Sequence, residues 1–270
     1  MKKVELRVSN LPNPRLAFSN RVYVNKSTFA QLVGSVSADL AKVSSGGSLT
    51  TADPHLNVIF SDLVFMASPL DGVNDGEIAL NSQQRKCGQF TLSQALNVIV
   101  FVPTTDVALH SLTIQVDLFV KKAGSKLAIQ APDISEAFKS QFQGQVFSVR
   151  QQIAMDFEGS KLDLLIEAFE HAAILDDNNK ATESTLTKGQ ILPGSTIFWK
   201  KSSGSTANIT FIGGEGPARN DSLFRSDFNF EQMGIGGLDE QFKKMFRTAF
   251  ASRIFPGLVK QVIIEYIGLK

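Results

Sequence analysis

The sequence predicts a mixed β and α+β protein, in which a closed β-barrel precedes a smaller α/β unit. Two observations support this. Short apolar stretches separated by Gly, Pro, Ser and Thr fill the first hundred residues, with no strong helical period among them. A long alternating strand followed by a helical period then opens the next hundred. Many short strands punctuated by turn residues are typical of a closed barrel, and a strand followed by a helix is typical of an α/β unit.

The predicted barrel takes in residues 1–103. Val4, Leu6 and Val8 alternate with polar residues, as in a half-buried strand, and turn residues follow at 10–14. Residues 44–54 are rich in Ser, Gly and Thr and are expected to form a loop. Further strands are expected at 21–24, 56–60, 63–66 and 96–102, the last of them ending at Pro103.

The predicted α/β unit takes in residues 104–212. One apolar face alternates from Leu112 to Val120, and the strand is expected to end at the pair Lys121 and Lys122. A helical period follows, for which Asp133 is a plausible N-cap. The polar stretch 176–189 is expected to be a mobile loop. Further strands are expected at 146–149, 152–157, 162–168, 195–199 and 207–212.

Two further segments complete the predicted organisation. Residues 213–226 contain glycines, a proline and little to bury, as in a flexible linker. In 227–270 one apolar face predicts a lone amphipathic helix that ends at Pro256. A single helix of this kind needs another surface to pack against. The residues of that face are Leu238, Phe242, Met245, Phe246, Ala249, Phe250 and Ile254.

Composition excludes several classes of function. The formal net charge is only +1, which gives no global support for binding nucleic acid or a membrane surface. No apolar run approaches the roughly 20 residues that span a bilayer. A single cysteine, Cys87, cannot form a disulfide within the chain and fits a reducing cytosol. The 21 Phe residues are expected to pack in cores.

The sequence contains no recognisable catalytic machinery. The phosphate-binding pattern G-x-x-x-x-G-K-[ST] is absent, and the three His residues have no partner at metal-ligand spacing. No catalytic residue, metal or cofactor is therefore expected for this chain. Basic pairs are the better signal: Arg85–Lys86 follows a strand and a turn, whereas Lys121–Lys122 and Lys200–Lys201 end strands. Each pair is either a solvated end of an element or part of a patch for an acidic partner.

Several segments together resemble one family, the N-ethylmaleimide-sensitive fusion protein (NSF), a hexameric AAA ATPase that disassembles SNARE complexes. The strongest matches are DFNFEQMGIGGLDEQF at 227–242 and FRTAFASRIFPGLV at 246–259, which resemble the lead-in to the first ATPase domain. FKSQFQGQVFSVRQQIAMDF at 138–157, GEIALNSQQRKCG at 76–88 and NLPNPRLAFSNRVYVN at 10–25 resemble its N-terminal domain. The resemblance extends from about residue 10 to residue 259.

This resemblance implies a double-psi β-barrel followed by a smaller α/β subdomain. It also implies that a basic surface binds the adaptor SNAP and, through it, the SNARE complex. The family's basic residues fall on Arg85, Lys86, Lys121 and Lys122. Gly234, Ile235 and Gly236 correspond to the segment that covers the adenine of ATP, although full-length members need ATP and Mg²⁺ and this sequence lacks the phosphate loop.

Three functions remain open under the resemblance. The chain could be a SNAP- and SNARE-binding N-terminal region, which would be cytoplasmic and peripheral to membranes through its partners. It could be part of a complete vesicle-fusing ATPase, with ATP-driven SNARE disassembly as the activity. It could also be a free-standing inhibitory fragment that binds the adaptor. The first and third predict a monomer, whereas the family is hexameric. Cys87 is not the family's alkylation-sensitive cysteine, and 262–270 departs from the family pattern.

Overall fold

The computed structural model describes residues 2–46, 49, 52–104, 107–120, 124–171 and 187–213. The chain divides into two compact units, Met1–Gly216 and Pro217–Lys270, and every described residue belongs to the first. The amphipathic helix predicted for 227–270, and all of the predicted linker beyond Gly213, therefore lie outside the described residues.

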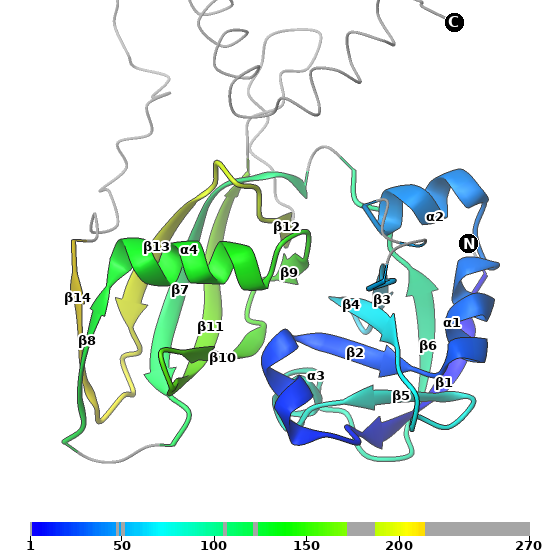
Figure 1. Ribbon diagram of the computed structural model, residues 1–270, viewed down its shortest axis with the longest axis horizontal. Coiled ribbons are helices and arrows are strands. Elements are labelled where there is room, and N and C mark those ends of the chain that lie inside the picture. The colour runs from blue at the N-terminus through cyan, green and yellow to red at the C-terminus, as the bar shows by residue number, and fades with distance from the viewer. Residues whose placement is uncertain are drawn as a thin grey trace, which may run out of the picture. The chain divides into compact units, whose positions relative to one another are not determined.

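Six strands close into a barrel, in the order β1-β5-β2-β4-β3-β6 (Figure 1). Two of the pairings, β1 with β5 and β2 with β4, are parallel, and the other four are antiparallel. This mixed closed barrel confirms the predicted fold class. The strands are β1 (Val4–Asn10), β2 (Arg21–Val24), β3 (Leu56–Phe60), β4 (Leu63–Pro69), β5 (Glu77–Leu80) and β6 (Ala95–Val100).

Short helices connect the barrel strands, and the sequence analysis did not predict them. Each α-helix begins at a residue whose side chain accepts a hydrogen bond from a backbone N–H of the first turn: Asn25, Ser37 and Asn81. The expectation of no helix in this region was wrong, because the helices are too short to show an apolar period. They are the 3-10 helix η1 (Pro14–Ser19) and the helices α1 (Lys26–Val33), α2 (Ala38–Ser44) and α3 (Ser82–Gly88).

The second subdomain is built on a four-stranded sheet of order β10-β11-β7-β13, with α4 (Ala131–Gln141) lying across one face (Figure 1). Two small ladders, β9 with β12 and β8 with β14, complete it. The strands are β7 (Leu109–Leu118), β8 (Lys126–Gln130), β9 (Val146–Ser148), β10 (Gln152–Phe157), β11 (Ser160–His171), β12 (Lys188–Gln190), β13 (Thr196–Lys201) and β14 (Asn208–Ile212).

Three boundaries in this subdomain differ from the prediction. The N-cap of α4 is Gln130 rather than Asp133, because Pro132 suits the first turn of a helix and places the start earlier. The long strand β7 ends at Leu118, two residues before Val120. The expected loop at 176–189 includes the start of β12, which pairs with β9.

Each subdomain has its own core of buried aromatic side chains. In the barrel, the rings of Phe60 and Phe65 stack with centroids 5.1 Å apart. In the second subdomain, Phe138 packs against Phe142 and, edge to face, against Trp199. The prediction that Phe packs the core is confirmed for these residues. The expected division after residue 103 falls in the connection between β6 and β7.

Candidate functional site

Helix α3 carries the first predicted basic pair, and local hydrogen bonds fix its position. Asn81 caps it in a reciprocal capping box: the Asn81 side chain accepts from the Gln84 backbone N–H, and the Gln84 side chain accepts from the Asn81 backbone N–H. Gln84 is buried and also donates to the backbone carbonyl of Arg21 at 3.2 Å. This buried glutamine ties the helix to the neighbouring strand β2.

Arg85 and Lys86 occupy the last turn of α3 and differ in their surroundings. Nη1 of Arg85 donates to the backbone carbonyl of Leu80 at 2.8 Å, and its side chain is half-buried. Lys86 is exposed and forms no ion pair within the described part of the chain. Cations near a helix C-terminus are stabilised by its dipole, so both residues suit the helix itself. Arg85 is additionally tied to the fold, whereas the Lys86 ammonium group is available to a partner.

The barrel meets the second subdomain along a polar contact surface, here called the seam, to which α3 contributes. Gln83 donates to Asp163 of β11 at 3.0 Å, and Sγ of Cys87 donates to the backbone carbonyl of Arg150 at 3.5 Å. The Lys161 ammonium group of β11 lies 5.7 Å from the ring centroid of Phe18. The basic pair on α3 therefore lies directly beside the second subdomain.

A cavity of about 530 Å³ opens at the seam, next to the C-terminal end of α3. Its only acidic lining residue is Asp62, which pairs with Lys188 of β12. We call this cavity the seam cleft. Its walls come from both subdomains: Ser61, Asp62, Leu63, Cys87, Gly88 and Gln89 from the barrel, and Ser148, Val149, Arg150 and Thr187 from the other side.

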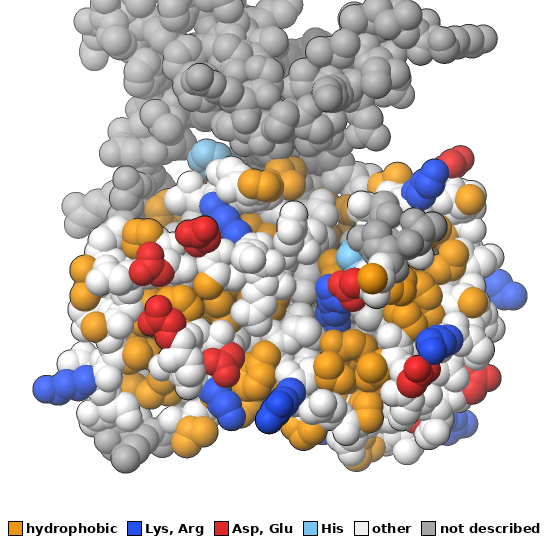
Figure 2. All heavy atoms as spheres, in the orientation of Figure 1, with side chains coloured by type: hydrophobic (Ala, Val, Ile, Leu, Met, Phe, Trp, Pro, Cys, Tyr) orange, Lys and Arg blue, Asp and Glu red, His pale blue; other side chains and the backbone are white. Residues whose placement is uncertain are grey.

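Charges of both signs are interspersed over the face drawn in Figure 2, with no continuous basic field. This matches the formal net charge of +1. Any attraction for an acidic partner must therefore come from a local cluster, and the end of α3 offers one.

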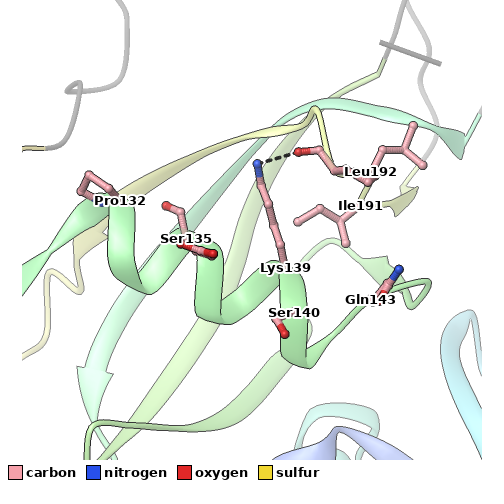
Figure 3. Close-up of a pocket in the computed structure, with 9 residues that line it drawn as sticks. Pro132, Ser135, Lys139, Ser140, Gln143, Ile191 and Leu192 are labelled. Atoms are coloured by element: carbon pink, nitrogen blue, oxygen red, sulfur yellow. Dashed lines mark hydrogen bonds between the residues drawn. The ribbon is translucent and has the colours of Figure 1, made fainter. Parts of the chain in front are cut away.

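A second cavity, of about 560 Å³, lies between α4 and the turn that leads into β13 (Figure 3). Lys139 crosses it, and its Nζ donates to the backbone carbonyl of Pro193 at 3.0 Å. Burial lowers the pKa of the Lys139 ammonium group. Because this lysine is already engaged with the fold, the groove offers a weaker cation than α3 does.

Comparison with known proteins gives relatives over nearly the whole chain. The vesicle-fusing ATPase of Caenorhabditis elegans is 31% identical over 98% of this chain, and that of Arabidopsis thaliana is 28% identical over 93%. The vesicular-fusion protein SEC18 of Saccharomyces cerevisiae is 27% identical over 98%. The resemblance to the NSF family is confirmed. The chain spans about a third of the length of these relatives, 32% in the case of the nematode protein.

A family model adds support for the second subdomain. The model described as cell division protein 48 (CDC48), domain 2, matches residues 128–169, which run from β8 through α4 into β11. These residues supply the second-subdomain side of much of the seam, including Arg150 and Asp163. The family model thus matches one segment of the subdomain that faces α3.

The remaining residues singled out through the NSF resemblance are not placed. Lys121 and Lys122 lie outside the described residues, as do Gly234, Ile235 and Gly236. Of the other basic pair, Lys200 forms an ion pair with Glu167 at 3.1 Å, as expected for a solvated strand end. Of the four NSF-type basic residues, the structure therefore places Arg85 and Lys86, together on one short helix.

Sequence reasoning missed two features of the seam. The sequence analysis predicts a turn before Arg85, although the pattern N-x-x-Q at Asn81 and Gln84 is a capping-box signal that identifies α3. Arg150 was not singled out, and no local pattern marks it. Its place at the seam cleft depends on contacts with residues distant in the sequence.

The part of the chain that the structure describes contains neither a candidate membrane span nor a group of metal ligands. None of the helices there has both the length and the apolar character needed to cross a bilayer. No group of three or more His, Cys, Asp and Glu side chains gathers there in a way that could hold a metal ion.

Proposed function

We propose that this chain docks an acidic adaptor of the SNAP type, and through it a SNARE complex, using the basic end of α3. The observation that carries the proposal is the exposed Lys86 beside the tethered Arg85, at the contact between the two subdomains. The vesicle-fusing names of the relatives supply the biological setting. Lys121 and Lys122 are proposed members of the same surface, by resemblance to the NSF family.

Arg85 and Lys86, the two basic residues that the structure describes, would contribute to docking in different ways. Arg85 is held by its bond to Leu80, so its charge is presented at a fixed point and little side-chain entropy is lost on docking. Lys86 is a mobile, hydrated point charge that can follow a partner's carboxylates. Such a surface raises the association rate and sets orientation more than it raises affinity, and salt weakens it.

We further propose that the chain acts as the substrate-engaging part of an ATP-driven, SNARE-disassembling hexamer at cytoplasmic membrane surfaces. The segment with Gly234, Ile235 and Gly236 favours this assignment, because it resembles the sequence over the adenine in such ATPases. ATP and Mg²⁺ would be needed by that assembly. On its own, the chain would act as a competing adaptor-binding fragment.

The test is binding of the chain to a preassembled SNAP–SNARE complex, measured for the wild type, Lys86→Glu and the control Lys42→Glu. Lys42 is an exposed cation on α2 and does not line the seam cleft. We expect the wild type and Lys42→Glu to bind alike, and Lys86→Glu to bind several-fold more weakly. A folded wild-type chain that does not bind, or a Lys86→Glu variant that binds unchanged, would contradict the proposal.

A further inference from the structure

We propose that Arg150, on the second-subdomain side of the seam, is a further residue of the docking surface and contacts a carboxylate of the acidic partner. The inference rests on the proposed function and adds a residue that the NSF resemblance does not supply. Three observations support the inference: the position of Arg150, its backbone conformation, and the ion pairs and hydrogen bonds that the neighbouring acidic groups already form.

Arg150 lies on the opposite bank of the seam cleft from α3. It belongs to the turn between β9 and β10, is exposed, and lines the cleft. Its backbone carbonyl accepts the hydrogen bond from Sγ of Cys87, the residue that follows Lys86 in α3. The backbones of the two basic positions are thus brought together by contacts between residues more than sixty positions apart, and both side chains are accessible.

The backbone of Arg150 is in the left-handed region, with φ of 67°. For a residue other than glycine this conformation is unfavourable, because Cβ lies too close to the following carbonyl oxygen. The turn imposes it: the Arg150 backbone N–H donates to the Ile166 carbonyl at 2.8 Å, and the Gln151 side chain accepts from the Ser148 backbone N–H at 2.9 Å. Glycine would fit here without that cost, as it does at Gly144 and Gly159.

Contacts within the described part of the chain do not offset this cost. The Arg150 guanidinium group forms no ion pair or hydrogen bond there, unlike that of Arg85. The acidic groups of the seam are already engaged, Asp62 by Lys188 and Asp163 by Gln83. Arg150, which lines the cleft, and Lys86, which precedes the lining residue Cys87, therefore remain as cations that form no ion pair with other described residues.

The partner that fits this arrangement is a folded protein surface with carboxylates spaced to reach both banks. Among the described residues that line the cleft, only Leu63 and Val149 carry aliphatic side chains, so the cleft offers few large apolar groups to anchor a partner. Arginine can bind a carboxylate through two parallel hydrogen bonds, which favours a positioned acidic side chain over a diffuse charge. Contact with both subdomains would also hold them together while the partner is bound.

The variant that tests this is Arg150→Gly, which removes the cation and relieves the backbone strain. Its unfolding free energy should equal or exceed that of the wild type, so that lost binding could not be attributed to lost folding. Ser93→Gly is the matched control, because Ser93 is exposed, has φ of 64° and does not line the cleft. Arg150→Lys keeps both the charge and the strain.

With the SNAP–SNARE complex as the probe, we expect Arg150→Gly to weaken binding about three- to tenfold and to reduce its salt dependence. Arg150→Lys keeps the charge but not the paired hydrogen bonds, so it should lose less affinity than Arg150→Gly, and Ser93→Gly should lose none. Unchanged binding by Arg150→Gly, while Lys86→Glu is impaired, would overturn this inference and leave the proposed function standing. Loss of binding in Arg150→Lys as large as in Arg150→Gly would also overturn it, because the charge would then not be what the partner recognises.

Discussion

Asn20 and Gln145, 125 residues apart in the chain, form a buried hydrogen bond of 3.0 Å from Asn20 Nδ2 to Gln145 Oε1. Both residues are 2% exposed. Nε2 of the same glutamine donates to the backbone carbonyl of Ser19 at 2.9 Å. The barrel and the second subdomain are therefore joined by a buried polar contact that pairs Nδ2 of Asn20 and both polar atoms of the Gln145 side chain. An adaptor that docks across the seam would meet a preformed surface.

Gln145→Leu should destabilise the chain by about 1–3 kcal/mol, because it leaves the buried Asn20 amide without its partner and removes a bond to the partly buried Ser19 carbonyl. Unfolding by urea measures the effect. Gln141→Leu is the matched control: Gln141 makes a similar bond, to the Phe18 carbonyl at 2.7 Å, but is exposed, so water can replace the lost bond. Equal losses in the two variants would show that burial at the seam is not what matters.

Arg85→Ala and Lys86→Ala should separate folding from docking. Lys86→Ala should change the unfolding free energy by no more than about 0.5 kcal/mol, as for an exposed side chain without partners. Arg85→Ala should cost about 1–3 kcal/mol, because it removes a charge-assisted bond to the Leu80 carbonyl. Both should weaken adaptor binding. A stability loss in Lys86→Ala as large as that in Arg85→Ala would contradict this division.

Alkylation of Cys87 measures directly whether the seam cleft is covered, because Cys87 lines the cleft and is the only cysteine in the sequence. A bound adaptor complex should slow its alkylation by a maleimide several-fold, since the partner would cover the cleft. Mass spectrometry of the modified chain measures the rate. The Lys86→Glu variant serves as the control, and its Cys87 should be alkylated at nearly the same rate with or without the complex. Absence of protection in the wild type would place the partner elsewhere, and equal protection in both proteins would show that Lys86 does not contribute to docking.

The stability of the barrel should fall as the pH drops below about 6.5, because of His55. Burial lowers the pKa of His55 below its ordinary value of 6.5, although its Nδ1 donates to the Asp53 carbonyl at 3.0 Å, which acts in the opposite direction. The unfolded chain therefore binds a proton at a higher pH than the folded chain does. The neutral His55 ring therefore contributes its full stabilisation above pH 6.5. This contribution is lost as the pH falls towards the lowered pKa of His55 in the folded chain.

Urea unfolding between pH 5 and pH 7.5 checks this prediction. His55→Gln, which does not titrate, should show a flatter pH dependence over that range than the wild type. The Asp53 carboxylate should contribute only at lower pH, because a hydrogen bond from Arg21 holds its pKa below the ordinary value of 3.8. A variant whose stability falls between pH 7 and pH 5 as steeply as that of the wild type would show that His55 is not the responsible group.

Local pattern explains which parts of the fold the sequence could predict. The strand β1 was found because Val4, Leu6 and Val8 alternate with exposed residues and are themselves buried. The strand β6 was predicted differently, from the continuous apolar run at 96–102 that stops at Pro103, and it spans Ala95–Val100. Helix α3 was missed because seven residues show no helical period, although its capping box was present in the sequence. Periodicity identifies strands of this length well, whereas helices this short are found through their caps.

The candidate site also has one part that local sequence patterns predict and one part that they do not. Arg85 and Lys86 stood out as adjacent charges after a strand, which is a local signal. The opposite bank could not be predicted, because Arg150 reaches the cleft only through the pairing of β9 and β10 with distant elements. Its left-handed backbone also depends on bonds to Ile166 and on the turn at Ser148. No propensity for arginine would indicate that conformation.

The most direct test of adaptor docking is the association rate constant for the SNAP–SNARE complex, measured from low to physiological salt with the wild type and Lys86→Glu. Steering by local charge predicts that the wild-type rate constant falls about tenfold or more over this range, and that Lys86→Glu is slower and less sensitive to salt. A wild-type rate constant that does not change with salt, or equal salt dependence in the two proteins, would contradict the proposal that the basic end of α3 receives an acidic partner.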